Sequence, residues 1–193
     1  MGRAKSYGIP GFDQRKAYMK SPIVYFDTSV FIGLLDNVEG RQPTARNIIR
    51  YESDCQSQIH TSIMTVNEFI SRTFDTYHDQ VTLTDKVQEV IQSIRNIAQI
   101  QGFNESVATE AARMLSIWGR VRLTNPLLPR DKKFRWDSIH LATANLIKAE
   151  RVYAWDDTWN DFPVDEIKGI GKIISPAVAP QTDEQPPLFN EEA

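Results

Sequence analysis

The sequence predicts an α/β protein built on a parallel sheet, with helices on both faces of that sheet. Short apolar segments that suit strands alternate along the chain with longer segments that suit amphipathic helices. The run from Ile23 to Phe26 is wholly apolar and stops abruptly at Asp27, a pattern typical of a buried strand. With 193 residues, 41% of them hydrophobic, the chain is long enough for one domain with a sizeable core.

Composition divides the chain into three parts. Residues 1–20 form an irregular basic extension, for which a disordered leader is an equal alternative. Residues 21–175 carry the alternating strands and helices of the predicted domain. Residues 176–193 contain four prolines, four acids and no basic residue, and are predicted to be a disordered tail.

The elements are expected in the following order. Strands are predicted near 22–26, 57–63, 99–103, 151–155 and 172–175. Helices are predicted near 29–36, 43–54, 65–77, 87–97, 104–118 and 137–150, with a break at 79–84. Between the last two helices, residues 119–136 carry two prolines and six basic residues against one acid, and we expect a long basic loop there.

Some classes of protein are disfavoured by composition. Cys55 is the only cysteine, so neither a disulfide within the chain nor a cysteine zinc site is expected. No apolar run has the length of a membrane span, and no apolar stretch follows the basic residues near the start. A cytoplasmic setting without membrane contact is therefore expected.

Four acids are predicted to lie at one edge of the sheet. Asp27 ends the first strand, Glu68 lies in the first turn of the helix after the second strand, Asp137 opens a helix, and Asp156 ends the next strand. The carboxyl ends of parallel strands share an edge with the amino ends of the following helices. Four carboxylates there would repel one another, and Mg²⁺ or Mn²⁺ would relieve this repulsion.

Each acid also has a simpler explanation. Asp27 or Ser29 could cap the following helix, although for Asp27 we favour membership of the acidic set. Glu68 could close a capping box or pair with a basic residue one turn later. Asp137 could be a helix cap, and Asp156 with Asp157 could form an ordinary turn.

These residues resemble the PIN domain, and the resemblance covers about residues 22–175. It is carried by DTS at 27–29, SIMTVNEF at 62–69, DSIHLATA at 137–144, and VYAWD at 152–156 followed by DF at 161–162. Within that family the chain most resembles the small VapC-type toxins of toxin–antitoxin pairs. The fold that the resemblance implies is a parallel-sheet α/β/α sandwich of the PIN-like type.

The resemblance implies a metal-dependent ribonuclease whose acidic quartet is Asp27, Glu68, Asp137 and Asp156. One or two Mg²⁺ or Mn²⁺ ions would activate a water that attacks phosphorus, leaving 5′-phosphate and 3′-hydroxyl ends. Ser29 would match the family's small polar residue near the first acid. The family often has Thr or Ser where this chain has Ala154, a departure that leaves Asp157 as a rival to Asp156 as ligand.

Other residues are expected to bind substrate or to pack in the core. Phosphate contacts are expected from the basic segment, with a solvated charged loop as the alternative. Its proposed substrate-binding residues are Arg130, Lys132, Lys133 and Arg135. His140 is expected to pack or hydrogen-bond rather than to bind metal, and Trp155 and Trp159 to pack in the core rather than to stack on a base.

The partners expected from the resemblance are an RNA substrate, a cognate antitoxin protein and a second copy of the chain in a homodimer. Two alternatives stay open: an RNA-processing nuclease unrelated to toxins, and a PIN-like module that binds RNA or protein without cleaving. The complete acidic quartet argues against the second alternative, and Ala154 argues weakly for it.

Overall fold

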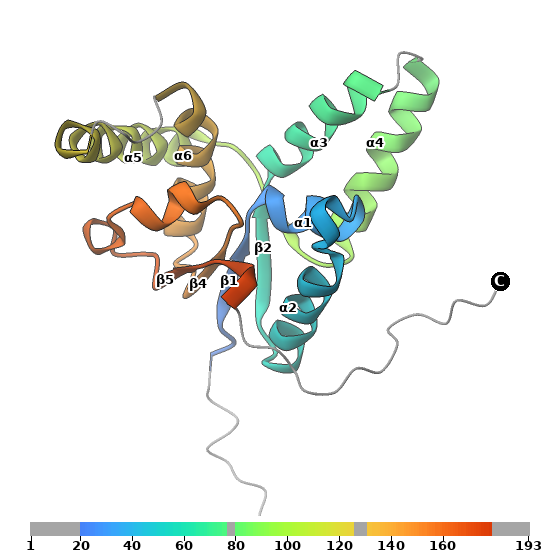
Figure 1. Cartoon of the computed structure of the whole chain (residues 1–193), viewed down its shortest axis with the longest axis horizontal. Helices are drawn as coiled ribbons and strands as arrows, with labels where there is room; N and C mark the ends of the chain where they lie inside the picture. The colour runs from blue at the N-terminus through green and yellow to red at the C-terminus, as the bar shows by residue number, and fades with distance from the viewer. Residues whose placement is uncertain (1–19, 77–79, 126–130, 179–193) are drawn as a thin grey trace, which may run out of the picture.

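The computed structural model describes residues 20–76, 80–125 and 131–178, which form a five-stranded sheet with helices on both faces (Figure 1). The strands are β1 (Ile23–Phe26), β2 (Gln58–Ser62), β3 (Gln99–Gln101), β4 (Arg151–Tyr153) and β5 (Lys172–Ile174). The helices are α1 (Thr28–Leu35), α2 (Gln42–Asp54), α3 (Ile63–Thr76), α4 (Gln80–Arg95), α5 (Glu105–Thr124) and α6 (Asp131–Leu146). The predicted α/β/α class is confirmed.

All neighbouring strands pair in parallel, in the order β3-β2-β1-β4-β5. From β1 the chain builds the sheet outwards on one side with β2 and β3, and then returns to the other side of β1 with β4 and β5. Ligand sites in open α/β sheets lie at the carboxyl ends of the strands where the order reverses. In this sheet that point is the end of β1, next to Asp27.

Successive side chains of the central strands point to opposite faces of the sheet, and this divides the core into two clusters. Tyr25 and Val152 face one side, where they pack with α5 and α6 around the stacked rings of Trp118, Phe134 and Phe162. The alternate residues of the same strands face the other side of the sheet, where they pack against α1, α2, α3 and α4. These residues are Val24, Phe26 and Tyr153. The central strands are therefore apolar on both faces, which explains the uninterrupted apolar run at the start of β1.

Local signals set several helix boundaries as predicted. The Asn104 side chain accepts from the backbone N–H of Val107 at 3.0 Å and caps α5. Pro43 stands in the first turn of α2, where its missing N–H costs nothing.

The predicted loop at 119–136 is wrong for most of its length. Helix α5 continues to Thr124, and α6 begins at Asp131, so only residue 125 and the undescribed residues 126–130 separate them. Arginine and lysine are good helix formers, and basic composition alone was a poor indicator of a loop here. The break predicted at 79–84 is also wrong from Gln80 onward, because α4 starts there.

The two ends of the chain are described only in part. Residues 1–19 of the predicted extension and residues 179–193 of the predicted tail lie outside the described residues. Pro176–Val178, at the start of the predicted tail, form the 3-10 helix η5, in which Pro176 is buried. Within the described ranges, none of the helices combines the length and the apolar character needed to cross a membrane.

Two glycines provide a matched test of how tightly the chain packs beside β5. A Cβ on Gly171 would lie 2.4 Å from the Glu150 carbonyl oxygen, whereas a Cβ on Gly119, inside α5, would meet no atom within 4 Å. We expect Gly171→Ala to lower the free energy of unfolding by about 2 kcal/mol. Gly119→Ala should raise it by about 0.5–1 kcal/mol, because alanine favours the helix.

Urea denaturation followed by circular dichroism measures both changes. Equal stabilities of the two variants would contradict the packing described at Gly171.

Candidate functional site

The predicted acids lie at the carboxyl edge of the sheet, but two of them sit deeper in their helices than expected. Asp27 follows β1 directly, and Asp156 follows β4. Glu68 is in the second turn of α3, which begins at Ile63, and Asp137 is in the second turn of α6. The expectations of a first-turn Glu68 and a helix-opening Asp137 are therefore wrong, because both helices start earlier than the sequence indicated.

Asp27 both caps α1 and faces the site. Its Oδ2 atom accepts from the backbone N–H of Ser29 at 3.1 Å and from the Ser29 hydroxyl at 2.7 Å. The sequence-based preference against a capping role for Asp27 is thus wrong. Its other oxygen, Oδ1, lies 3.7 Å from Nδ1 of His140. Burial raises the pKa of the Asp27 carboxyl and Glu68 adds to the effect, while His140 and Ser29 oppose it.

Ser29 joins the ends of two adjacent strands. Its hydroxyl donates to Asp27 and accepts from the backbone N–H of Trp155 at 3.0 Å. One side chain therefore fixes the start of α1 to the segment after β4. This position supports Asp27 directly and Asp156 through the neighbouring backbone.

His140 lies at the centre of the acids. The ring is 1% exposed; its Nδ1 atom is 2.6 Å from the Tyr25 hydroxyl, and its Nε2 atom is 3.6 Å from Oε1 of Glu68. Burial acts to lower the pKa of His140, but Glu68, Asp27 and Asp137 outweigh it and the pKa is raised. The expected hydrogen-bonding role is confirmed.

The spacing of His140, three residues after Asp137 on one face of α6, is consistent with contact to the site. Its position between Asp27 and Glu68 was not predicted from the sequence.

Asp137 carries the clearest sign of an unfilled interaction. Its Oδ2 atom is buried and has no hydrogen-bond partner among the described residues. Burial raises the pKa of this carboxyl to about 7, with further contributions from Asp27 and Asp156 and opposing ones from His140 and the Trp159 side chain. Because a buried carboxylate oxygen without a donor is costly, this atom is well suited to accept a cation.

Asp156 and Asp157 differ in their surroundings. Asp156 caps the 3-10 helix η3 (Asp157–Asp161), and its Oδ1 atom accepts from the Thr158 backbone N–H at 2.9 Å and from the Thr158 hydroxyl at 2.6 Å. Its charge also contributes to the raised pKa of Asp137. Asp157 is exposed. Of the two, the structure therefore links Asp156 with the other acids.

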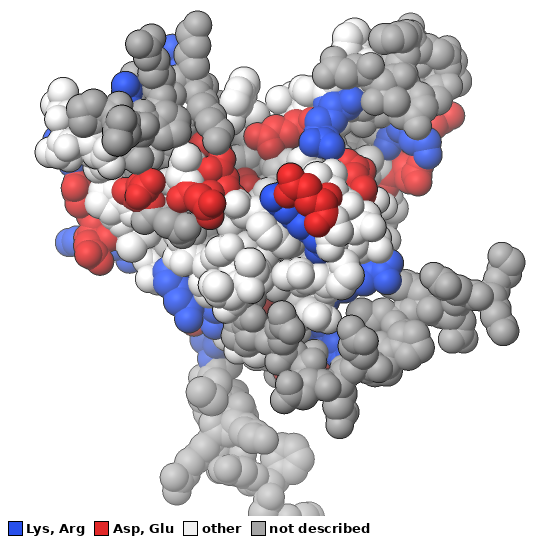
Figure 2. Space-filling model, in the orientation of Figure 1, with Lys and Arg blue, Asp and Glu red and all other residues white. Residues whose placement is uncertain are grey.

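The acids share one edge without converging on a single point. Figure 2 shows acidic side chains along the hollow between the α3–α4 pair and the α5–α6 pair. Within the described parts of the chain, no three His, Cys, Asp or Glu side chains are close enough together to hold one metal ion. The chemistry of these side chains nevertheless suits a hard divalent cation, because they offer carboxylate oxygens as ligands. One of these oxygens, Oδ2 of Asp137, makes no hydrogen bond to a described residue.

The predicted phosphate-binding residues are only partly described. Arg130 lies outside the described residues, and Lys132 and Lys133 fall in the first turn of α6, where the backbone alone is described. Arg135 is exposed on α6. Arg120, from the same basic segment, pairs with Glu166.

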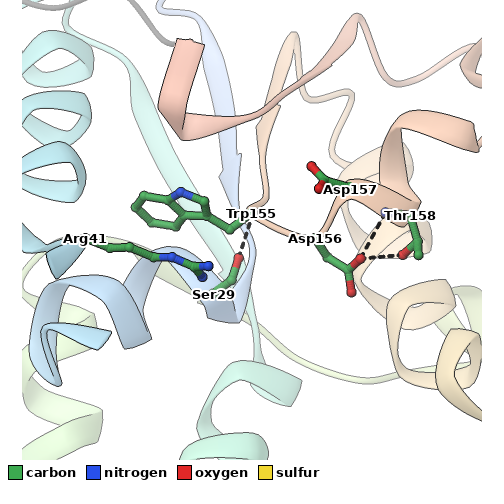
Figure 3. A pocket seen from close by; sticks show the side chains of 6 residues that line it. All are labelled: Ser29, Arg41, Trp155, Asp156, Asp157 and Thr158. Atoms are coloured by element: carbon green, nitrogen blue, oxygen red, sulfur yellow. Dashed lines mark hydrogen bonds between the residues drawn. The ribbon is translucent and has the colours of Figure 1, made fainter. Parts of the chain in front are cut away.

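A pocket of about 420 Å³ adjoins the acidic edge (Figure 3). It is lined by Ser29, Arg41, Trp155, Asp156, Asp157 and Thr158. The Arg41 guanidinium lies 5.2 Å from the centre of the indole ring of Trp155. Of the two tryptophans considered from the sequence, Trp159 is buried, as expected for core packing, whereas Trp155 is half-buried and lines this pocket.

Comparisons with known proteins concern the fold. No family model matches the chain, and no curated protein sequence matches it. One similar solved structure is VapBC2 from Rickettsia felis bound to a DNA fragment from its promoter; another is VapBC-5, a member of the VapBC toxin–antitoxin family from Mycobacterium tuberculosis. The first is 8% identical with a TM-score of 0.49, and the second is 17% identical with a TM-score of 0.45. Each alignment covers 79% of this chain and 98% of the other.

Proposed function

We propose that this protein is a metal-dependent endoribonuclease that cleaves RNA phosphodiester bonds at the carboxyl edge of its sheet. The observation that carries the proposal is the buried, unpartnered Oδ2 atom of Asp137, whose carboxyl pKa is raised by burial and by the nearby charges of Asp27 and Asp156. Clustered carboxylates of this kind favour a divalent cation, and cation-bound carboxylates at the end of a parallel sheet suit phosphoryl transfer.

Asp27, Glu68, Asp137 and Asp156 would hold Mg²⁺ or Mn²⁺. When bound, the cation would supply a water of lowered pKa and neutralise charge on the phosphate. The other residues position this set. Ser29 holds Asp27 through its hydroxyl and the end of β4 through the Trp155 backbone. His140 is fixed by the Tyr25 hydroxyl between Asp27 and Glu68, where it limits the repulsion between these two acids.

The test is cleavage of a labelled single-stranded RNA in Mg²⁺ or Mn²⁺, with and without a chelator. We expect cleavage by the wild type, and none with the chelator or with Asp27→Asn. Asparagine can still accept from the Ser29 N–H and cap α1, so the variant should fold while losing a charged ligand.

The matched control is Asp165→Asn, which removes an exposed acid in the 3-10 helix η4 (Val164–Glu166), outside the quartet. It should cleave like the wild type. Cleavage that survives both the chelator and Asp27→Asn would rule out the proposed chemistry.

A second candidate is a module that binds RNA or protein without cleaving. It is favoured by the position of His140, a buried group of raised pKa that can itself offset the charge of Asp27 and Glu68. It is also favoured by the lack of a three-residue metal cluster among the described residues. RNA binding in a mobility-shift assay without cleavage in either metal would select this candidate.

Biologically, the resemblance of the sequence motifs supports a cytoplasmic toxin with a cognate antitoxin and a homodimeric state. An RNA-processing nuclease is the alternative. Growth arrest on expression, relieved by co-expression of a neighbouring gene, would favour the toxin; unimpaired growth with active enzyme would favour processing.

A further inference from the structure

We propose that the pocket beside the acidic edge is a nucleotide subsite. In this subsite Arg41 binds a backbone phosphate of single-stranded RNA, and Trp155 contacts the adjoining base. The inference rests on the proposed function and extends the site from the acids that would act on the scissile phosphate to a neighbouring nucleotide. Ser29 and Asp156 line both the acidic edge and the pocket, so the two are continuous.

The pocket combines the two groups that bind single-stranded nucleic acid without reading its sequence. Arginine supplies a cation and a planar fork for phosphate oxygens, and an aromatic ring supplies a surface for a base. Figure 3 shows Arg41 and Trp155 entering from one side, while Asp156, Asp157 and Thr158 lie on the other. The half-buried indole keeps part of its surface available to a ligand.

Arg41 can exchange its present carboxylate partner for a phosphate at low cost. It pairs with Glu39, whose side chain is 68% exposed, while 31% of the Arg41 side chain is exposed. Exposed ion pairs contribute little free energy because water and salt screen them. A phosphate that accepts two hydrogen bonds from the guanidinium is a stronger partner.

The backbone holds Arg41 in place before any ligand binds. The residues before it form a tight turn, in which the Asn37 side chain accepts from the N–H of Gln42 at 3.1 Å. The Gln42 side chain in turn donates to the Leu34 carbonyl at 2.8 Å. A Cβ on Gly33 would lie 3.0 Å from both Arg41 Cβ and Trp155 Cζ3, so glycine permits the close approach of this pair.

The acids on the opposite wall of the pocket should make RNA binding depend on a divalent cation. Asp156 and Asp157 would repel a phosphate, so the pocket should take RNA only when a divalent cation offsets the acidic edge. This requirement favours a nucleic-acid strand that bridges metal and Arg41 over a free anion.

Fluorescence anisotropy of a labelled RNA of about ten nucleotides tests the subsite, with Ca²⁺ as the cation and RNA integrity checked on a gel. We expect Arg41→Gln to weaken binding and to reduce the slope of log K against log salt by about 0.7, the value for one phosphate on a single strand. Trp155→Leu should weaken binding about fivefold or more. Arg41→Lys should keep the salt slope. Arg95→Gln, an exposed arginine in the last turn of α4, should change neither quantity.

The outcomes separate the subsite from the proposed function. A wild type that neither binds nor cleaves RNA overturns both. A wild type that binds and cleaves, with unchanged affinity and salt slope in Arg41→Gln and Trp155→Leu, overturns the subsite alone. If Trp155→Leu fails to fold, the Arg41→Gln result decides, because it changes only a partly exposed side chain.

Discussion

Asp137→Asn is expected to stabilise the metal-free protein at pH 8 while lowering the proposed RNA cleavage about a hundredfold or more. The Asp137 carboxyl has a pKa near 7 in the folded protein because it is buried beside Asp27 and Asp156. In the unfolded chain its pKa returns to about 4. At pH 8 the folded state must therefore hold a charge that its surroundings disfavour, and a neutral amide removes this cost.

The pH dependence follows from the direction of the shift. Below about pH 4 the group is protonated in both states and costs nothing; as pH rises towards 7, stability falls by up to about 4 kcal/mol. The raised pKa of His140 acts in the same direction, since its stabilising contribution is lost as pH rises through the folded pKa. The melting temperature of the metal-free wild type should therefore decrease as the pH is raised from 5 to 8.

Melting curves at pH 5 and pH 8, with and without millimolar Mg²⁺, measure the effect. The wild type should gain melting temperature from Mg²⁺ at pH 8, and Asp137→Asn should show a smaller gain and a weaker dependence on pH. Asp165→Asn is again the control. A variant that melts lower than the wild type at pH 8 and cleaves normally would refute the role given to Asp137.

Glu52→Ala is expected to cost about 3–5 kcal/mol of stability, the largest effect on folding that we anticipate for a single substitution here. The Glu52 side chain is fully buried and accepts from Arg151 at 2.8 and 2.7 Å and from the Tyr153 hydroxyl at 2.7 Å. Removing it leaves a largely buried guanidinium and a buried hydroxyl without this partner. Burial works against the charged form of Glu52, but the hydrogen bonds from Arg151, Ser57 and Tyr153 outweigh it and lower the pKa.

Urea denaturation at pH 7 measures this loss. Asp54→Ala removes an exposed acid two residues along the same helix and should stay within about 0.5 kcal/mol of the wild type. The Glu52 contribution should decline as pH falls through its lowered pKa, opposite in sign to Asp137. Similar stabilities of Glu52→Ala and Asp54→Ala would show that this buried cluster contributes little.

The fold was largely predictable because its signals are local. The apolar run of β1, the N-cap Asn104 and Pro43 each act within a few residues of their position. The region around 119–136 was predicted wrongly because charge does not distinguish a solvated loop from a solvated helix surface. Both prolines fall among residues 126–130, between the described ends of α5 and α6, so their presence did not exclude either helix.

From the sequence, the site could be placed at the carboxyl edge of the sheet, but its side-chain contacts could not be predicted. Parallel strands place Asp27 and Asp156 together through topology, and this needs no side-chain detail. The positions of His140, Ser29 and Arg41 depend on contacts between residues 29 and 155, 25 and 140, and 41 and 155. Periodicity within one segment carries no information on such contacts between distant segments.

The division of the core into two clusters has a consequence for synthesis on the ribosome. A nascent chain that has emerged as far as β3 already contains Asp27 and Glu68, along with α1 to α4, which supply most of one core cluster. It lacks Asp137, His140 and Asp156, and β1 has no β4 to pair with. Any activity that needs all four acids therefore arises only after α6 and β4 have been made, so a chain interrupted earlier would be inert.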